Sequence, residues 1–355
     1  MEFLTHSTDG QGPDASGRKG LFQRACSPIP PPAALLGALL LAALVFLHAF
    51  GNGKNGLAAA GAVGADAGDT GPFASLTLEA QSAYVYDLAT ETVLFERYPE
   101  RRMALASLAK LMTALAAQRL LDQDAQVRIS VHAISAQGDD GLLVGERFRA
   151  KDVLDIMLVR SSNDAALALA EAGARILGEL PAGADAAAST TQLYTSTGTQ
   201  TQKADSDATV PFIRFMNAEA QRLGLRETEF FNSTGLDVSE DLSGAYGSAK
   251  DVVALGAAFL REAPEQFSAT RRTALSVASI DGFLHKLENT NDLLYDIPGL
   301  IAAKTGFTDL AGGNLLVLFD LGVQHPIAAV VLGSTEQGRF TDMLQLINAA
   351  YAGRP

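Results

Sequence analysis

The stretch GNLLVLFDLGVQHPIAAVVL, residues 313–332, decides the fold of this chain. It contains two apolar runs, residues 313–321 and 326–332, that are rich in Val, Ile, Leu and Phe and have the length of ordinary strands. A shorter run, residues 299–304, precedes them, and residues 338–351 follow with apolar side chains at helical spacing. The C-terminal part of the chain is therefore predicted to form three strands and a closing helix.

A β-hairpin is predicted near the other end of the domain. Residues 76–87 and 93–98 alternate or cluster β-forming residues on either side of a polar stretch. Two early strands and three late ones predict one sheet whose edges come from both ends of the domain, with a second lobe built from the helices between them. Helical periodicity is found in residues 107–121, 153–177, 212–223 and 248–262.

The overall composition is that of a folded protein that avoids nucleic acid. Hydrophobic residues make up 48% of the 355 residues and charged residues 19%, which is ordinary for a chain with a sizeable core. The 27 basic and 40 acidic side chains give a net charge of −13, which repels phosphate backbones. No nucleic-acid partner is expected.

Few residues are suited to hold a metal. Cys26 is the only cysteine, so no disulfide can form within the chain and no multi-cysteine site exists. The five histidines are scattered, and none forms a pair at the helical spacing that would place two ligands on one face. Neither a metal nor another cofactor is expected.

Residues 33–50 are apolar except for His48, and Arg18, Lys19 and Arg24 lie upstream. The run is near the lower length limit for a spanning helix and longer than the core of a usual signal peptide. A buried core helix is disfavoured because the run has no polar face. It is predicted to be an uncleaved membrane anchor, with a secretory signal segment as the alternative.

The membrane prediction divides the chain. Residues 1–32 are expected to form a cytoplasmic tail, because basic residues before a span stay inside, and everything after the span is expected outside the cytoplasm. Residues 51–75 are predicted to be a flexible linker, since they consist mostly of Gly, Ala, Asp and Asn. Residues 76–355 would form the folded domain, interrupted at 183–209 by a low-complexity surface insertion.

Ser107 and Lys110 lie three residues apart at the start of a predicted helix, which places both side chains on one face, one turn apart. A neutral lysine at that position can take the serine proton. The N-terminal N–H groups and the positive end of the helix dipole favour an alkoxide and an oxyanion. Taken alone, the pair is far more often an ordinary N-cap serine followed by a helix lysine.

Two further polar clusters follow along the chain. Residues 161–164 read Ser-Ser-Asn-Asp and sit between two helical segments, where such residues usually cap a helix or shape a turn. Residues 304–306 read Lys-Thr-Gly at the end of an apolar run, so Lys304 is expected to project from a strand, and Gly306 allows another backbone to approach closely. Each cluster has an ordinary structural explanation, but the ordered set in helix, loop and strand context favours a catalytic site.

With these motifs the sequence resembles the serine-type D-alanyl-D-alanine carboxypeptidases, which are low-molecular-mass penicillin-binding proteins. The likeness runs from about residue 76 to residue 351. It implies a mixed α/β (α+β) fold of the β-lactamase/transpeptidase kind, with a five-stranded antiparallel sheet flanked by helices and an all-helical lobe. The residues that carry it are Ser-x-x-Lys at 107–110, Ser-x-Asn at 161–163 and Lys-Thr-Gly at 304–306, with supporting stretches at 83–87, 232–237 and 289–294.

The resemblance also implies the catalytic roles. Ser107 would attack the carbonyl of the penultimate D-alanine of a peptidoglycan stem peptide, release the terminal D-alanine and leave an acyl-enzyme that water hydrolyses. Lys110 would be the general base, with its pKa lowered by burial and by the nearby cation of Lys304. Ser161 would relay a proton to the leaving amine. β-Lactam antibiotics would acylate the same serine.

Substrate binding is carried over in the same way. Asn163 would orient the substrate amide, and Lys304 and Thr305 would bind the terminal carboxylate beside Gly306. The backbone N–H groups of Ser107 and Phe307 would form the oxyanion hole.

This chain departs from the family pattern in three places. The insertion at 183–209 lengthens the gap between the second and third motifs. Phe307 occupies a position that is polar in some relatives. The chain ends at Pro355, so the second β-rich domain and the amphipathic C-terminal anchor of many relatives are expected to be missing, and the N-terminal segment is expected to be the only tether.

Three alternative functions share parts of the pattern. A D,D-endopeptidase uses the same catalytic residues and differs only in the shape of its cleft. The most similar β-lactamases use a glutamate followed by Leu-Asn between the second and third motifs, and Glu219, Glu227 and Glu229 are not followed by that pair. An inactive peptidoglycan-binding relative is disfavoured because every motif residue is intact. Peptide preference and oligomeric state stay open.

Overall fold

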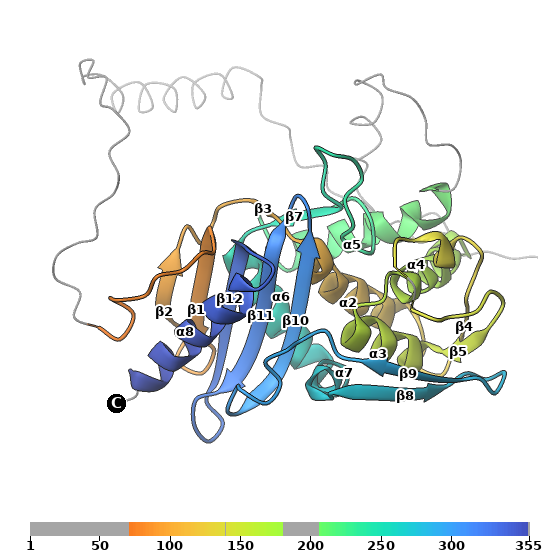
Figure 1. Cartoon of the computed structure of the whole chain (residues 1–355). Helices are drawn as coiled ribbons and strands as arrows, with labels where there is room; N and C mark the ends of the chain where they lie inside the picture. Colours follow the sequence, from red (N-terminus) through yellow and green to blue (C-terminus); the bar gives the residue numbers. More distant parts are fainter. Residues whose placement is uncertain (1–70, 139, 180–205, 354–355) are drawn as a thin grey trace, which may run out of the picture. The chain divides into compact units, whose positions relative to one another are not determined.

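The computed structural model of the chain describes residues 71–138, 140–179 and 206–353 (Figure 1). The predicted cytoplasmic tail, residues 1–32, and the predicted membrane segment, residues 33–50, lie outside the described residues, as do most of the predicted linker and insertion. Within the described ranges, no helix is both long enough and apolar enough to span a membrane.

One antiparallel sheet of five strands organises the fold, with the strand order β10-β11-β12-β1-β2. The predicted sheet is therefore confirmed, including its edges, because β2 comes from the start of the domain and β10 from its end. The strands are β1 Ser82–Asp87, β2 Thr92–Arg97, β10 Leu300–Thr308, β11 Gly312–Asp320 and β12 Pro326–Ser334.

Helices cover both faces of this sheet. The helix α8, Gly338–Ala352, packs on one face, and α6, Ala249–Glu262, packs on the other. Successive strand residues alternate between the two cores: Leu316 lies in the cluster that includes α6, and its neighbour Leu315 lies in the cluster that includes α8. A strand buried on both faces needs a continuous apolar run, which explains the sequence of residues 313–332.

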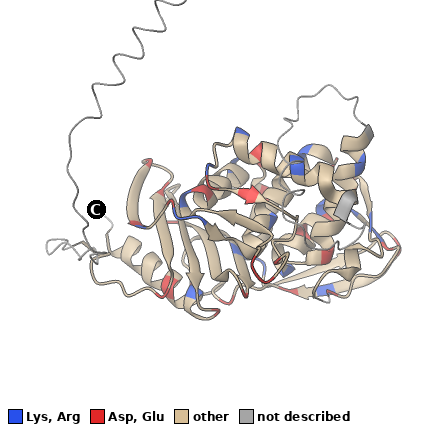
Figure 2. Cartoon of the chain, turned by 90° about the horizontal axis from the view of Figure 1, so that it is seen from above, with Lys and Arg blue, Asp and Glu red and all other residues tan. Residues whose placement is uncertain are grey.

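Charged side chains are kept out of the middle of the sheet. The three central strands carry a charge only at their last residues, Asp87 on β1 and Asp320 on β11. In Figure 2 the strands are largely tan, and acidic and basic residues are interspersed along the rest of the ribbon. The buried Lys304 is an exception, and it lies on the edge strand β10.

The second lobe is mainly helical, as predicted. One of its 3-10 turns falls on the last four residues of the predicted insertion, so helical structure begins before residue 209. The helices and turns are α2 Lys110–Leu120, α3 Ala150–Arg160, α4 Asn163–Glu179, α5 Val210–Arg222, α7 Pro264–Ser268, η1 Ala106–Ala109, η2 Ala133–Ser135, η3 Ser206–Thr209 and η4 Ala269–Arg271.

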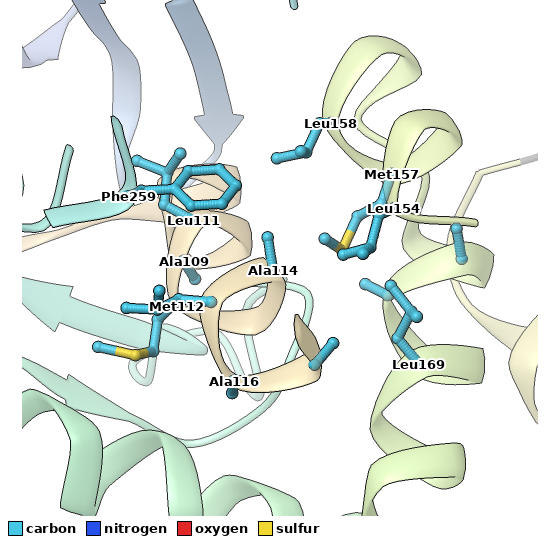
Figure 3. Packing of buried hydrophobic residues seen from close by; sticks show 14 of the residues in the cluster. Ala109, Leu111, Met112, Ala114, Ala116, Leu154, Met157, Leu158, Leu169 and Phe259 are labelled. Carbon is cyan, nitrogen blue, oxygen red and sulfur yellow. The ribbon is translucent and has the colours of Figure 1, made fainter. Parts of the chain in front are cut away.

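The helix α2 runs through the centre of this lobe. Residues 110–117 are all buried, and Figure 3 shows side chains of neighbouring helices around α2, including Phe259 of α6, Leu154 of α3 and Leu169 of α4. A helix segment that is buried on every side can only be stable in such a position. The polar Lys110 at its first residue is therefore carried into the core by the helix it begins.

The lobe differs from the all-helical expectation because it also carries short β ribbons. These strands have two to five residues, which is too few for a clear period in the sequence. In the structure, the hairpin β8–β9 alternates buried and exposed residues. The ribbons are β3 Met103–Ala104, β6 Glu229–Phe230 and β7 Ala245–Gly247, then β4 Gln126–Arg128 with β5 Arg147–Arg149, and β8 Ala274–Ala278 with β9 Leu284–Glu288.

The packing of α5 on α4 predicts opposite effects for two glycines of one helix. A Cβ atom at Gly173 would lie 2.5 Å from the Phe212 ring, whereas a Cβ at Gly178 meets nothing within 4 Å. We expect Gly173→Ala to lower the free energy of unfolding by about 1–3 kcal/mol. We expect Gly178→Ala to leave it unchanged or raise it by up to about 1 kcal/mol. Urea unfolding measures both, and equal stability of the two variants would contradict this packing.

Candidate active site

The three sequence motifs meet at the junction of the sheet edge and the helical lobe. Ser107 lies in the turn η1 and Lys110 begins α2. Ser161 ends α3 and Asn163 begins α4. Lys304 lies on β10, which packs against η1. Residues separated by up to about two hundred positions are thus brought together by the two lobes.

Lys110 is the centre of the site. Its side chain is completely buried, and its Nζ lies 2.9 Å from Ser107 Oγ, 2.7 Å from Asn163 Oδ1 and 2.7 Å from the carbonyl oxygen of Thr234. The last two oxygens can only accept hydrogen bonds. A neutral amine has two N–H groups for them, and its lone pair then faces Ser107. The neutral lysine is therefore placed to accept the serine proton.

Burial sets the protonation state of this amine. Removal from water lowers the pKa of Lys110 to about 7, and the charge of Asp140 partly opposes the effect. Burial was the first of the two causes expected from the sequence. Lys110 and Lys304 repel each other's charged forms, and burial first, and then the charges of Lys110 and Arg339, lower the pKa of Lys304 well below its usual value.

Ser161 is the second hydroxyl of the site. Its Oγ accepts a hydrogen bond of 2.7 Å from Lys304 Nζ, and its backbone has a left-handed conformation with φ 63°. Ala106, directly before Ser107, also has a positive φ of 48°. Such backbone conformations cost a non-glycine residue on the order of 1–3 kcal/mol and are concentrated at functional sites. Both motif serines thus depend on an unusual backbone.

Asn163 has both ends of its amide engaged by the protein. Its Oδ1 accepts from Lys110, and its Nδ2 donates to the carbonyl oxygen of Gln137 at 2.6 Å. One further lone pair and one further N–H remain available for a substrate amide, so the predicted orienting role stays possible in geometry. The structure adds a task that the sequence did not indicate, namely to hold the amine of Lys110.

The edge strand β10 supplies the other wall. Lys304 Nζ also donates to the carbonyl oxygen of Thr305 at 2.9 Å. Gly306 permits the close approach predicted for it, because a Cβ there would lie 3.0 Å from the carbonyl oxygen of Leu105 and 3.2 Å from the nitrogen of Ser107. The two backbone segments assigned to the oxyanion hole are therefore adjacent, while the ring of Phe307 is 42% exposed.

The loop that supplies the Thr234 carbonyl is held by its own side chains. Asn232 Oδ1 accepts hydrogen bonds from the backbone nitrogens of Thr234 and Gly235, at 3.2 and 2.7 Å. Gly235 has φ 79°, and a Cβ there would lie 1.9 Å from the carbonyl oxygen of Ala106. Only glycine fits this contact. The stretch at 232–237, known from the sequence as a family likeness alone, thus positions the carbonyl that accepts from Lys110.

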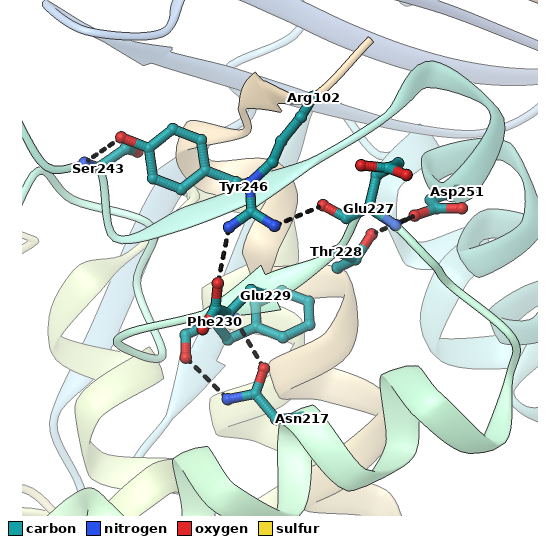
Figure 4. A network of polar contacts seen from close by, with 9 residues as sticks. All are labelled: Arg102, Asn217, Glu227, Thr228, Glu229, Phe230, Ser243, Tyr246 and Asp251. Carbon is teal, nitrogen blue, oxygen red and sulfur yellow. Dashed lines mark hydrogen bonds and ion pairs between the residues drawn. The ribbon is translucent and has the colours of Figure 1, made fainter. Parts of the chain in front are cut away.

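A polar network supports the strands on either side of that loop (Figure 4). Arg102 forms an ion pair of 2.7 Å with Glu229 and lies over the ring of Tyr246, with 5.1 Å from its guanidinium carbon to the ring centroid. Asn217 holds both backbone groups of Phe230, at 2.8 Å each. The network joins α5 to β6 and β7, and so fixes the two ends of the loop that contains Thr234.

Arg339 is a candidate functional residue that sequence reasoning missed. It lies in the first turn of α8, is 8% exposed, and its NH1 donates to the carbonyl oxygen of Gly306 at 2.9 Å. Its buried Nε has no hydrogen-bond partner among the described residues, and burial lowers its pKa. A single arginine in an ordinary helix gives no sequence signal. In the fold it brings a second cation to the strand of Lys304.

Comparison with known proteins agrees with this geometry. The family profile described as D-alanyl-D-alanine carboxypeptidase, peptidase family S11, matches residues 69–175 and 205–336. The D-alanyl-D-alanine carboxypeptidase DacF of Bacillus subtilis (strain 168) is 30% identical over 284 residues, which are 78% of this chain and 63% of the relative. The D-alanyl-D-alanine endopeptidase of Escherichia coli (strain K12) is 29% identical over 269 residues, 73% of this chain and 72% of the relative.

Solved structures support the fold. The D-alanyl-D-alanine carboxypeptidase from Mycobacterium tuberculosis H37Rv has a TM-score of 0.62 at 24% identity and covers 79% of this chain and 94% of its own. Penicillin-binding protein D2 from Listeria monocytogenes, solved in its ampicillin-bound form, has a TM-score of 0.56 at 26% identity. The match covers 78% of this chain and 98% of the Listeria chain. With the family profile matched over more than half of its length, the chain belongs to the D-alanyl-D-alanine carboxypeptidase family, peptidase family S11.

Proposed function

We propose that this protein removes the terminal D-alanine from peptidoglycan stem peptides through an acyl-enzyme on Ser107, and that β-lactam antibiotics acylate the same residue. The observation that carries the proposal is the buried Lys110, whose amine contacts Ser107 Oγ and two oxygens that can only accept hydrogen bonds. The chain spans 63% of the length of its Bacillus subtilis relative. The activity is therefore proposed from the site and the family together.

Acylation follows from the contacts. Lys110 takes the proton of Ser107, and Oγ attacks the carbonyl carbon of the penultimate D-alanine. The negative oxygen of the tetrahedral intermediate lies between the N–H groups of Ser107 and Phe307. When the C–N bond breaks, Ser161 passes a proton to the leaving amine. For the proton held by Lys110 to replace it, Ser161 must exchange its contact with Lys304 for one with Lys110. Water then hydrolyses the ester.

The wall formed by β10 suits a peptide with a free C-terminus. As an edge strand, β10 has backbone groups on one side that no neighbouring strand of the sheet uses, and an extended peptide can pair with them. Lys304 and Arg339 bring two buried cations to this wall. An anion bound between them favours the charged form of both, which the empty site disfavours. The terminal carboxylate of the substrate is such an anion.

The β-lactamase alternative receives no support from the three glutamates considered. Glu219 forms ion pairs with Arg119 and Arg222, and Glu229 is paired with Arg102. Among the described residues none of the three contacts Ser107 or Lys110 through a hydrogen bond. A D,D-endopeptidase remains the second candidate, because a relative with that name aligns over 73% of this chain.

We also propose that residues 33–50 anchor the protein in the cell membrane and that the catalytic domain lies outside the cytoplasm. The three upstream basic residues and the extracytoplasmic substrate support this orientation. Protease added to spheroplasts, whose cytoplasmic membrane is intact, should digest the domain. Protection of the domain until the cells are lysed would contradict the orientation.

Removing the nucleophile tests the central assignment. We expect the full chain to gain the mass of benzylpenicillin within minutes, with the adduct on Ser107, and to release D-alanine from a pentapeptide. Ser107→Ala should abolish both signals, because no acyl-enzyme can form, yet still bind the peptide. Ser239→Ala, on an exposed loop, is the control. An adduct on the Ser107→Ala protein would contradict the assignment, and rapid turnover of the adduct in the unaltered protein would favour a β-lactamase.

The lowered pKa of Lys110 predicts the pH dependence of acylation. Below pH 7 the amine is mostly protonated and cannot accept the serine proton, and above pH 7 it is mostly neutral. The acylation rate constant with benzylpenicillin should therefore rise about tenfold per pH unit below pH 7 and level off above it. Stopped-flow measurements from pH 5 to 8.5 test this, with circular dichroism as the check on folding. A rate that does not change through pH 7 would exclude Lys110 as the base.

A further inference from the structure

We infer that Thr290 is a positioning residue that orients the hydroxyl of Thr305 towards the C-terminal carboxylate of the substrate. This inference rests on the proposed function, because it concerns how that site recognises a free C-terminus. It goes further than the three motifs, since Thr290 belongs to none of them and lies in the loop between β9 and β10.

The two hydroxyl groups are in direct contact. Thr290 Oγ1 lies 2.6 Å from Thr305 Oγ1, and it is the only hydrogen-bond partner of the Thr305 hydroxyl within the described part of the chain. Thr305 is 4% exposed, so its hydroxyl has few other orientations. The Thr305 hydroxyl therefore donates either to Thr290 or to a ligand bound beside it.

The position of Thr290 is set by its neighbours. Asn289 Nδ2 donates to the carbonyl oxygens of Thr270 and Arg272, at 2.8 Å each, and Asn289 Oδ1 accepts from the nitrogen of Asn291 at 2.9 Å. The nitrogen of Thr290 itself donates to the carbonyl oxygen of Val159. These bonds hold the loop without using the Thr290 hydroxyl.

Thr290 thereby connects two of the motifs. Val159 lies two residues before Ser161, and Thr305 directly follows Lys304. The backbone of Thr290 is bonded to the first segment and its side chain to the second. Thr290 is thus bonded both to the end of α3 and to the strand β10.

The proton count shows what the contact does. Each hydroxyl has one proton, and in the contact between them either oxygen can be the donor. When a carboxylate binds, Thr305 must donate to it, so Thr290 must donate to Thr305. Two donors in series polarise each other and strengthen the bond to the anion. A neutral C-terminal amide gains less from the same arrangement, because the stronger bonds are those to charged acceptors.

The test compares two peptides on the full-length protein. One ends in D-Ala-D-Ala with a free carboxylate, and the other carries a C-terminal amide. We expect Thr290→Val, which keeps the shape and the backbone N–H, to lower kcat/KM about tenfold for the carboxylate and about twofold or less for the amide, mainly through KM. Thr290→Ser restores the hydroxyl and should restore the preference. Thr92→Val, an exposed threonine on β2, should leave both rates unchanged.

A double variant separates positioning from packing. If Thr290 acts through Thr305, Thr290→Val should add nothing to Thr305→Val, whereas independent effects would multiply. Arg339→Gln is the positive control for lost carboxylate preference. If Thr290→Val lowered kcat/KM equally for the two peptides, or did not lower it, the inference would be overturned while the proposed function stands. An unaltered protein that neither cleaves the carboxylate peptide nor reacts with benzylpenicillin would overturn both.

Discussion

The burial of one amine is the constraint on which the rest of this structure depends. Lys110 is completely enclosed, and its nitrogen is satisfied by three oxygens that come from three different segments. An unpaired buried cation costs several kcal/mol, so a site of this kind exists only if those oxygens are held in place. The helix α2, in which residues 110–117 are all buried, supplies the burial, and the surrounding segments supply the oxygens. Low solvation then leaves the lysine able to act as a base near neutral pH.

The second wall of the site is built by close backbone contact. Gly306 lets β10 approach the turn that contains Ser107, and Gly235 lets the loop with Thr234 press against Ala106. Side chains at these two positions would separate the strand, the nucleophile and the carbonyl that accepts from Lys110. The glycines therefore determine distances that the catalytic residues themselves cannot set. Strain at Ala106 and Ser161 is tolerated because packing on both sides over-determines their conformation.

Cations accumulate on the β10 side of the cleft. Lys304 and Arg339 are both buried there. Burial lowers the pKa of each, and the charges of Lys110 and Arg339 lower that of Lys304 further. Such an arrangement is unfavourable without an anion and becomes favourable with one, which is a physical basis for selecting a free carboxylate. The contact between Thr290 and Thr305 adds a directional hydroxyl to the same wall. Under the function that we propose, charge and proton direction together select the carboxylate end of a peptide chain.

The apolar runs at 313–332 and the three spaced motifs were sufficient to predict the sheet, its edges and the candidate catalytic residues, because strand periodicity and the order of motifs are local properties of the chain. The tertiary structure alone decided which groups touch them. Arg339 has no local signal, and the stretches that contain Thr234 and Thr290 resembled the family without giving either residue a contact, since a single arginine, threonine or carbonyl looks ordinary until folding places it beside a motif. The lowered pKa of Lys110 was predicted with burial as its first cause, but the packing of distant helices that produces this burial cannot be read from spacing.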